Sequence, residues 1–260
     1  MGTAKGELRL EINPRSLSAM IDVAVVATSD VVNFHLHWLG QANLDEPAPV
    51  EGALFRFNGP ELDAAQRRAL HESWIVGRAF QELLRAVRQA LEEAYVITTL
   101  LNKRHPVKSN STIAEFLKPF QRKAAAMRFP ELLDAVNEKL DPKLNFAKSY
   151  ESLQVARNCL EHRAGIVSTI DTHGKKQFDL QIPRMKMFYV RNSEEIELAR
   201  GERIDPGDER VEVEIFSKLE VRRKSIAVGE RLMFTPAEFN EIAFACHFLG
   251  TELAGKLPKP

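Results

Sequence analysis

Cysteine is scarce in this chain of 260 residues, which contains only Cys159 and Cys246. Two cysteines so far apart cannot form a disulfide framework, and they do not supply the ligand set of a structural zinc site. Both stand in apolar segments with helical spacing. We therefore expect two buried free thiols that contribute to packing rather than to chemistry.

Neither sign of charge is in excess, because 36 basic residues face 36 acidic residues. A polyanion-binding function therefore cannot come from the net charge, and any basic surface must be local. The start of the chain lacks the apolar core of a signal peptide. No stretch approaches the roughly 18 consecutive apolar residues of a membrane span. These absences predict a cytoplasmic protein without a membrane partner.

The signatures of several enzyme classes are also missing. The sequence has no glycine-rich phosphate loop and no serine in a Gly-x-Ser-x-Gly elbow. His71-Glu72 is not followed by the second histidine of a zinc-binding helix. His35 and His37 lie two residues apart, so on a helix they point to different faces and make poor co-ligands. We expect neither a metal nor a cofactor.

The hydrophobic pattern predicts a mainly α fold of the α+β class, a helical bundle with a β-hairpin insertion before the C-terminal helix. Helices are expected over residues 16–40, 60–103, 112–120, 130–140 and 145–164. The first is apolar on most sides, which predicts a central place in the bundle. Strands are expected over residues 7–12, 177–182, 185–190, 211–216, 219–221 and 225–228, with a turn at 205–208. Thr235 and Pro236 predict the start of the last helix.

These elements predict one composite domain in three segments. Residues 1–166 form the helical bundle, residues 167–233 form the β-rich insertion, and residues 234–260 form a helix that packs back on the bundle. Gly165 is expected to end the fifth helix in the left-handed conformation.

The end of that fifth helix carries the most informative residues. Asn158 and His162 are four apart, so they lie on one helical face. Arg157 lies about 140° round the helix from His162, and its long side chain can lean across this gap. A cation, an amide and an imidazole can therefore meet beside a helix end, a combination suited to binding a phosphate.

Arg157-Asn158-x-x-x-His162 resembles the R-x4–6-H motif of the HEPN family (higher eukaryotes and prokaryotes nucleotide-binding domains), and Gly-Ile-Val follows it on leaving the helix. The resemblance implies a helical bundle that dimerises. Many members are metal-independent ribonucleases of toxin, phage-defence and CRISPR systems, and others are inactive binding or scaffolding modules. A toxin of this kind also implies a protein antitoxin as a partner.

The chemistry of RNA transesterification fits these residues. His162 can carry protons, because an unperturbed imidazole titrates near neutral pH. Arg157 can offer a planar set of donors to the phosphate, and Asn158 can position it. One histidine cannot easily serve as acid and base at once, and the resemblance implies a composite site across a homodimer. An ordinary reading stays open, since Arg157 and Glu161 are spaced as a helix ion pair and the helix dipole favours a histidine near its C-terminus.

A local basic segment adds to the nucleic-acid hypothesis. Between residues 103 and 128 the chain has seven basic residues and a single acid, Glu115. Such a segment can hold an RNA backbone through phosphate contacts, although a solvated helix face has the same composition. The candidate RNA-binding residues are Lys103, Arg104, Lys108, Lys118, Arg122, Lys123 and Arg128.

The sequence thus predicts a metal-independent endoribonuclease that acts as a homodimer. The alternatives are a non-catalytic module that binds RNA, a nucleotide or a protein, and a structural helical protein in which the motif arises by chance.

Overall fold

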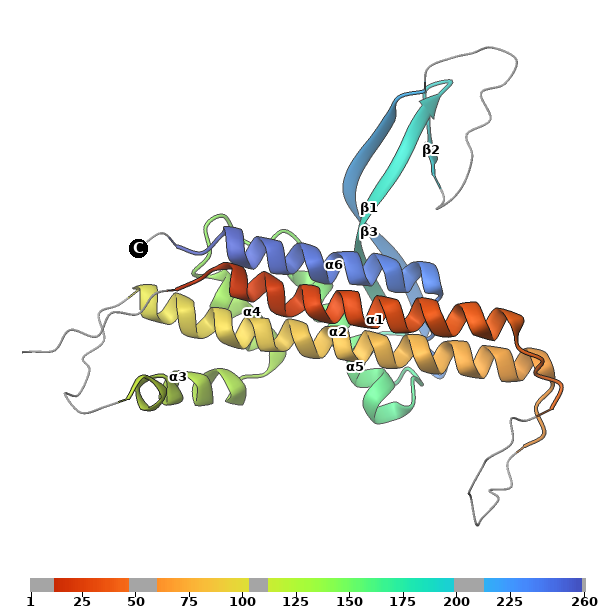
Figure 1. The fold of residues 1–260 in the computed structure, drawn as a ribbon, viewed down its shortest axis with the longest axis horizontal. Coiled ribbons are helices and arrows are strands. Elements are labelled where there is room, and N and C mark those ends of the chain that lie inside the picture. Colours follow the sequence, from red (N-terminus) through yellow and green to blue (C-terminus); the bar gives the residue numbers. More distant parts are fainter. Residues whose placement is uncertain (1–11, 47–59, 103–111, 199–212, 259–260) are drawn as a thin grey trace, which may run out of the picture.

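The computed structural model describes residues 12–46, 60–102, 112–198 and 213–258. This part of the chain is mainly helical, with a small antiparallel sheet that projects from the helices (Figure 1). It therefore belongs to the α+β class. The elements in chain order are α1 (Arg15–Gln41), α2 (Ala64–Asn102), α3 (Ile113–Ala126), α4 (Phe129–Asn137), α5 (Ala147–Arg163), β1 (Gln177–Arg191), β2 (Glu194–Glu197), β3 (Ile215–Ala227) and α6 (Pro236–Gly255).

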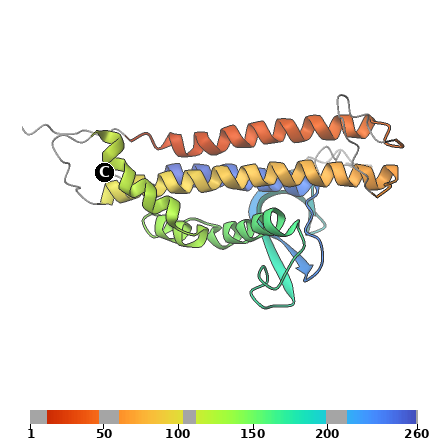
Figure 2. The same ribbon diagram turned by 90° about the horizontal axis from the view of Figure 1, so that it is seen from below.

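The central helix is α2, which packs against every other helix of the described residues. Many of its apolar side chains, among them Phe80, Leu83 and Leu91, are fully buried. The helix α1 lies on one side of α2, and α3 to α5 lie on the other (Figure 2). The last helix, α6, returns to pack against α1, α2 and β1.

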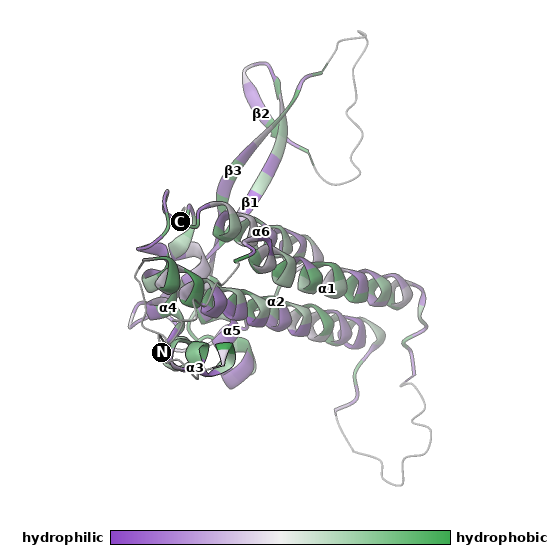
Figure 3. Cartoon of the chain, turned by 60° about the vertical axis from the view of Figure 1, so that its left-hand side comes forward, coloured by the Kyte–Doolittle hydropathy of each residue, from purple (hydrophilic) through white to green (hydrophobic). Residues whose placement is uncertain are grey.

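The prediction that the first helix is central was wrong. Leu17, Ile21 and Val32 are buried in contacts with the bundle, but Val23 and Phe34 are 71% and 60% exposed. Hydrophobic residues recur along α1 (Figure 3), and composition alone does not tell which of them meet a neighbour. Among the described residues, α1 packs mainly against α2 and α6, and this leaves much of its remaining surface exposed.

The length and composition of α1 also correct the expectation that no segment approaches a membrane span. One window of 18 residues in this helix has a mean hydropathy of 1.5 and is only 22% buried, which meets the minimum for a membrane-spanning helix. The two aspartates within α1, Asp22 and Asp30, interrupt its apolar runs, so a count of consecutive apolar residues misses it. A buried helix of a soluble protein and a signal sequence near the N-terminus meet the same criterion of length and hydropathy, so the absence of a membrane partner stays a prediction.

Helix starts follow the local sequence closely. The side chains of Thr112 and Thr235 accept hydrogen bonds from the backbone N–H groups of Glu115 and Glu238, and each glutamate bonds back to the backbone of its threonine. These capping boxes satisfy backbone groups that the first helical turn leaves free. The predicted starts of α3 and α6 are therefore confirmed.

The sheet has the strand order β2-β1-β3 and is antiparallel throughout. The two strands predicted on either side of Pro183 are a single strand, β1, which pairs with β3 along most of its length. Proline is tolerated at an open strand edge because it needs no ladder partner for an N–H group. Among the described residues no strand pairs with that edge at Pro183, since β2 pairs only with Phe188–Arg191. The predicted strand at residues 7–12 and turn at 205–208 fall outside the described residues, except for Ile12.

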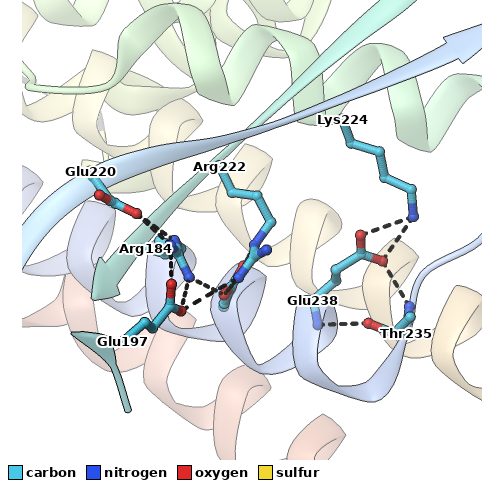
Figure 4. Close-up of polar contacts among 8 residues, drawn as sticks. Arg184, Glu197, Glu220, Arg222, Lys224, Thr235 and Glu238 are labelled. Carbon is cyan, nitrogen blue, oxygen red and sulfur yellow. Dashed lines mark hydrogen bonds and ion pairs between the residues drawn. The ribbon is translucent and has the colours of Figure 1, made fainter. Parts of the chain in front are cut away.

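Ion pairs join the base of the projecting sheet to α6 (Figure 4). The buried guanidinium of Arg184 donates hydrogen bonds to Glu197, Glu220 and Glu241. Arg222 donates to Glu241 at 2.7 Å. The hydrogen bond to Glu197 raises the pKa of Arg184, which therefore stays charged within the cluster. This cluster of ion pairs fixes the base of the projecting sheet relative to the helical bundle.

Candidate functional site

The helix α5 presents the predicted motif because its opposite face is buried. Tyr150, Leu153, Ala156 and Cys159 follow each other at intervals of three residues and are fully buried. The hydroxyl of Tyr150 donates to the carbonyl oxygen of Ala245 in α6 at 2.9 Å. Cys159 is a free thiol, and burial raises its pKa. The motif residues therefore lie on the remaining surface of a firmly packed helix.

The chain turns sharply directly after the motif. Ala164 and Gly165 both adopt the left-handed conformation, with φ of 52° and 80°. The N–H of Gly165 donates to the carbonyl oxygen of Cys159 at 3.1 Å, which closes the last turn of the helix. The left-handed conformation predicted for Gly165 is present and begins one residue earlier. A Cβ atom at Gly165 would lie 3.2 Å from the carbonyl oxygen of Leu232. Glycine, which has no Cβ atom, therefore also allows the backbone at residue 165 to lie close to the backbone at Leu232.

Arg157 and His162 both lie near the same carboxylate oxygen of Glu161. The Nη1 atom of Arg157 forms an ion pair with Oε2 of Glu161, and Nε2 of His162 lies 3.7 Å from the same Oε2. Arg157 Nη1 also lies 3.4 Å from Oδ1 of Asn158, which accepts a second hydrogen bond from Gln154 at 2.9 Å. A single negatively charged oxygen is thus within reach of both the guanidinium and the imidazole. The expected spacing of Arg157 and Glu161 as a helix ion pair is realised as well.

A groove of about 720 Å³ opens beside α5. Its walls come from α5, from α2, from the start of α4, from the loop before β1, and from the strands β1 and β3. Arg157 and Asn158 line this groove, whereas His162 does not and is largely exposed at the helix end. The groove is lined by six basic residues, three acidic residues and one histidine: Arg88, Arg128, Lys148, Arg157, Lys175, Arg223, Glu151, Asp171, Asp179 and His173.

His173 is a site residue that the sequence reasoning missed. It lies in the segment Asp171-Thr-His-Gly174, which has the composition of a turn. Its buried carboxylate, Asp171, accepts hydrogen bonds from the Arg163 guanidinium and from the backbone N–H and hydroxyl of Ser168. These bonds hold the loop, in which His173 has a φ of 51°. A histidine in a turn directly after the motif helix was the available signal.

Most of the described part of the predicted basic segment does not line the groove. Lys103, Arg104 and Lys108 fall outside them. Lys118, Arg122 and Lys123 are exposed on α3 and do not line the groove. Of the seven candidates, only Arg128 does. It stands directly before α4, where the chain approaches α5.

A second, more apolar hollow of about 270 Å³ lies on the other side of the motif turn. Leu160 and Ala164 border it from the end of α5, and Leu70, Trp74 and Met233 border it from α2 and the segment before α6. The last three side chains are about half exposed or more. Apolar side chains clustered at the surface mark interaction sites more often than isolated ones do.

Within the ranges that the structure describes, no cluster of three or more His, Cys, Asp or Glu side chains could hold a metal ion. The chain matches no protein-family model, and no characterised protein or solved structure is significantly similar to it. Function is therefore inferred from the residues around the end of α5.

Proposed function

We propose that this protein is a HEPN-like endoribonuclease that acts as a homodimer and cuts RNA without a metal ion, in a toxin or defence setting. The observation that carries the proposal is the shared oxygen, Oε2 of Glu161, which lies within reach of both Arg157 and His162. A phosphate oxygen placed there would meet the same two groups. Arginine and an imidazolium are the side chains that bind and protonate such an oxygen.

The proposed reaction is transesterification within the RNA. The 2′-oxygen attacks the adjacent phosphorus, the bond from phosphorus to the 5′-oxygen breaks, and the products are a 2′,3′-cyclic phosphate and a free 5′-hydroxyl. His162 takes the proton of the 2′-hydroxyl, and the partner subunit's His162 gives a proton to the leaving 5′-oxygen. Arg157 stabilises the negative charge of the phosphorane, and Asn158 positions the Arg157 side chain. Glu161 leaves Arg157 when the phosphate arrives.

The apolar hollow supports the homodimer. A composite site requires an interface directly beside His162, and the hollow adjoins the same helix end through Leu160 and Ala164. Trp74 is 61% exposed at its edge. A two-fold contact that buries this surface would remove apolar area from water and bring the two motifs together.

Cleavage of a mixed RNA pool in EDTA tests the proposal. EDTA inactivates contaminating metal-dependent nucleases, and the wild-type protein is compared with His162→Ala and with His35→Ala, a matched histidine change at an exposed position of α1 that does not line the groove. We expect cyclic phosphate ends from the wild type and a loss of at least about 100-fold in His162→Ala, the range of a general acid–base residue. The toxicity of wild-type expression should be lost in the same variant. Equal cleavage by wild type and His162→Ala, or none by either, would refute the catalytic proposal.

A specific observation favours a second candidate, an RNA-binding module that does not cut. Arg157 is already neutralised by Glu161, and His162 lies outside the groove that Arg157 lines. In this case Glu161→Gln would free Arg157 and strengthen RNA binding, and no variant would produce cyclic phosphate ends. An endoribonuclease would show cleavage in the wild type whatever the effect of Glu161→Gln on affinity.

A further inference from the structure

The groove beside α5 holds positive charge that the described residues do not neutralise. Over the whole chain basic and acidic residues balance, yet six basic residues and three acidic residues line this one hollow. An excess of one sign in a concave surface raises the local concentration of ligands of the opposite sign. The charges that matter are those left free to meet a ligand.

Four of the six basic side chains have no partner among the described residues and can contact a ligand. Arg88 is held by Glu92 and by the carbonyl oxygen of Met127, and Arg157 is held by Glu161. Among the residues that the structure describes, the side chains of the other four form no ion pair or hydrogen bond. These four are exposed at the groove wall: Arg128, Lys148, Lys175 and Arg223.

The acidic residues of the groove balance them only in part. The carboxylate of Asp171 is buried and directed at Arg163, which is not a lining residue. The carboxylate of Asp179 accepts hydrogen bonds from two neutral groups, the Ser225 hydroxyl and the Gln177 amide, so it keeps its negative charge, as does Glu151. The four free cations still outnumber these two carboxylates, and an anionic ligand would balance the remaining positive charge.

The walls of the groove are fixed before any ligand binds. The hydroxyl of Ser152 in α5 donates to the carbonyl oxygen of Gln181 in β1 and accepts from its N–H, at 3.1 and 3.0 Å. Asp171 holds the loop that carries Lys175. A preformed site loses less conformational entropy on binding than a flexible one does.

We propose that this groove binds a single strand of RNA by its phosphates and leads the strand to Arg157. The charge of the groove indicates a polyanion, and the choice of RNA as that polyanion rests on the proposed function. A volume of about 720 Å³ suits a small ligand or a short stretch of one strand and is too small for a duplex. The lining aromatics Phe129 and Phe178 are buried, so contact with phosphates dominates and sequence preference is weak.

The test measures binding in a His162→Ala background, in which the RNA stays intact. Fluorescence anisotropy of a labelled single-stranded RNA is recorded over a range of salt concentrations. The groove variant is Lys175→Glu with Arg223→Glu. The comparison variant is Lys118→Glu with Arg122→Glu, which makes the same change of charge on the exposed surface of α3. Circular dichroism and urea unfolding check that both variants are folded.

We expect the groove variant to weaken binding at least tenfold and the α3 variant to weaken it less than threefold. Loss of two phosphate contacts should also lower the slope of log K against log salt by about 1.4. Equal losses in the two variants, no loss in the groove variant, or equally tight binding of a duplex of the same sequence would overturn the proposal.

Cleavage by proteins with His162 intact separates this inference from the proposed function. If the groove variant cuts RNA as well as the wild type does, the groove proposal fails and the endoribonuclease stands. If binding depends on the groove but the wild type never cuts, the groove proposal stands and the enzymatic proposal fails.

Discussion

The loop that closes the groove depends on one buried carboxylate, and its removal is a sharp test of the structure. Asp171 accepts four hydrogen bonds, two from the Arg163 guanidinium and two from Ser168. Its side chain is only 1% exposed, whereas that of Arg163 is 23% exposed. Asp171→Ala would leave Arg163 and the backbone N–H of Ser168 without these partners. We expect the variant to lose stability and to loosen the loop that carries His173.

The magnitude follows from the burial of the two partners. Removal of one member of a buried ion pair costs about 3–5 kcal/mol, because the other charge is left without compensation. Water reaches part of Arg163, so we expect the lower end, about 3 kcal/mol. The double variant Asp171→Leu with Arg163→Met removes both charges. It should be less destabilised than the sum of the single variants by about 2 kcal/mol.

Urea unfolding followed by circular dichroism measures these differences, with the midpoint compared at constant m value. Asp179→Ala is the control, since this aspartate lines the same groove at an exposed position, and we expect a cost below about 1 kcal/mol. The reasoning would be refuted if Asp171→Ala cost no more than Asp179→Ala, or if the single changes added without coupling. RNA affinity of Asp171→Ala should fall together with its stability, because Lys175 would no longer be held at the groove.

Three further predictions address packing, pH dependence and assembly. Tyr150→Phe removes one buried hydrogen bond to Ala245 and should cost about 1 kcal/mol in urea unfolding, whereas a change below the experimental error would count against that bond. The hydrogen bond from Arg184 lowers the pKa of Glu197 in the folded protein. The ionised Glu197 side chain therefore stabilises the fold above the unfolded pKa of about 4.3, and this stabilisation is lost as the pH falls through the lower folded pKa. Glu197→Gln should therefore be less stable than wild type at pH 7 and approach it below about pH 4, and a constant difference across pH would contradict this linkage. Trp74→Asp should place a charge in the proposed dimer contact, shift size-exclusion elution to the monomer and abolish cleavage, and an unchanged dimer would move the interface elsewhere.

Some features of the fold could be predicted from the sequence because they depend on neighbours along the chain. The capping threonines Thr112 and Thr235 act on residues three positions away, and the left-handed turn at Gly165 closes on the helix just before it. The face of α5 that carries Arg157 and Asn158 follows from the spacing of its apolar residues. Interactions of this kind need no knowledge of the rest of the molecule.

Other features were decided by contacts between distant segments. Composition showed that α1 is apolar, but only packing decided that α2 and not α1 is central, since a helix face is buried only where another element meets it. Residues 177–182 and 185–190 were predicted as two strands, yet β1 runs through Pro183, where no described strand pairs with its second edge. Both errors have the same cause, namely that burial and strand pairing depend on which segments become neighbours in space.

The candidate site also has one part that the sequence predicts and another part that only the tertiary structure reveals. The sequence alone identified Arg157, Asn158 and His162, because they belong to one helix with a regular spacing. The tertiary structure decided that Lys148, His173 and the cations of three other segments share a groove with two of these residues, while His162 stands outside it. Periodicity describes one element at a time. A groove is formed by side chains from several elements, so its charge and shape are set by the packing that brings them together.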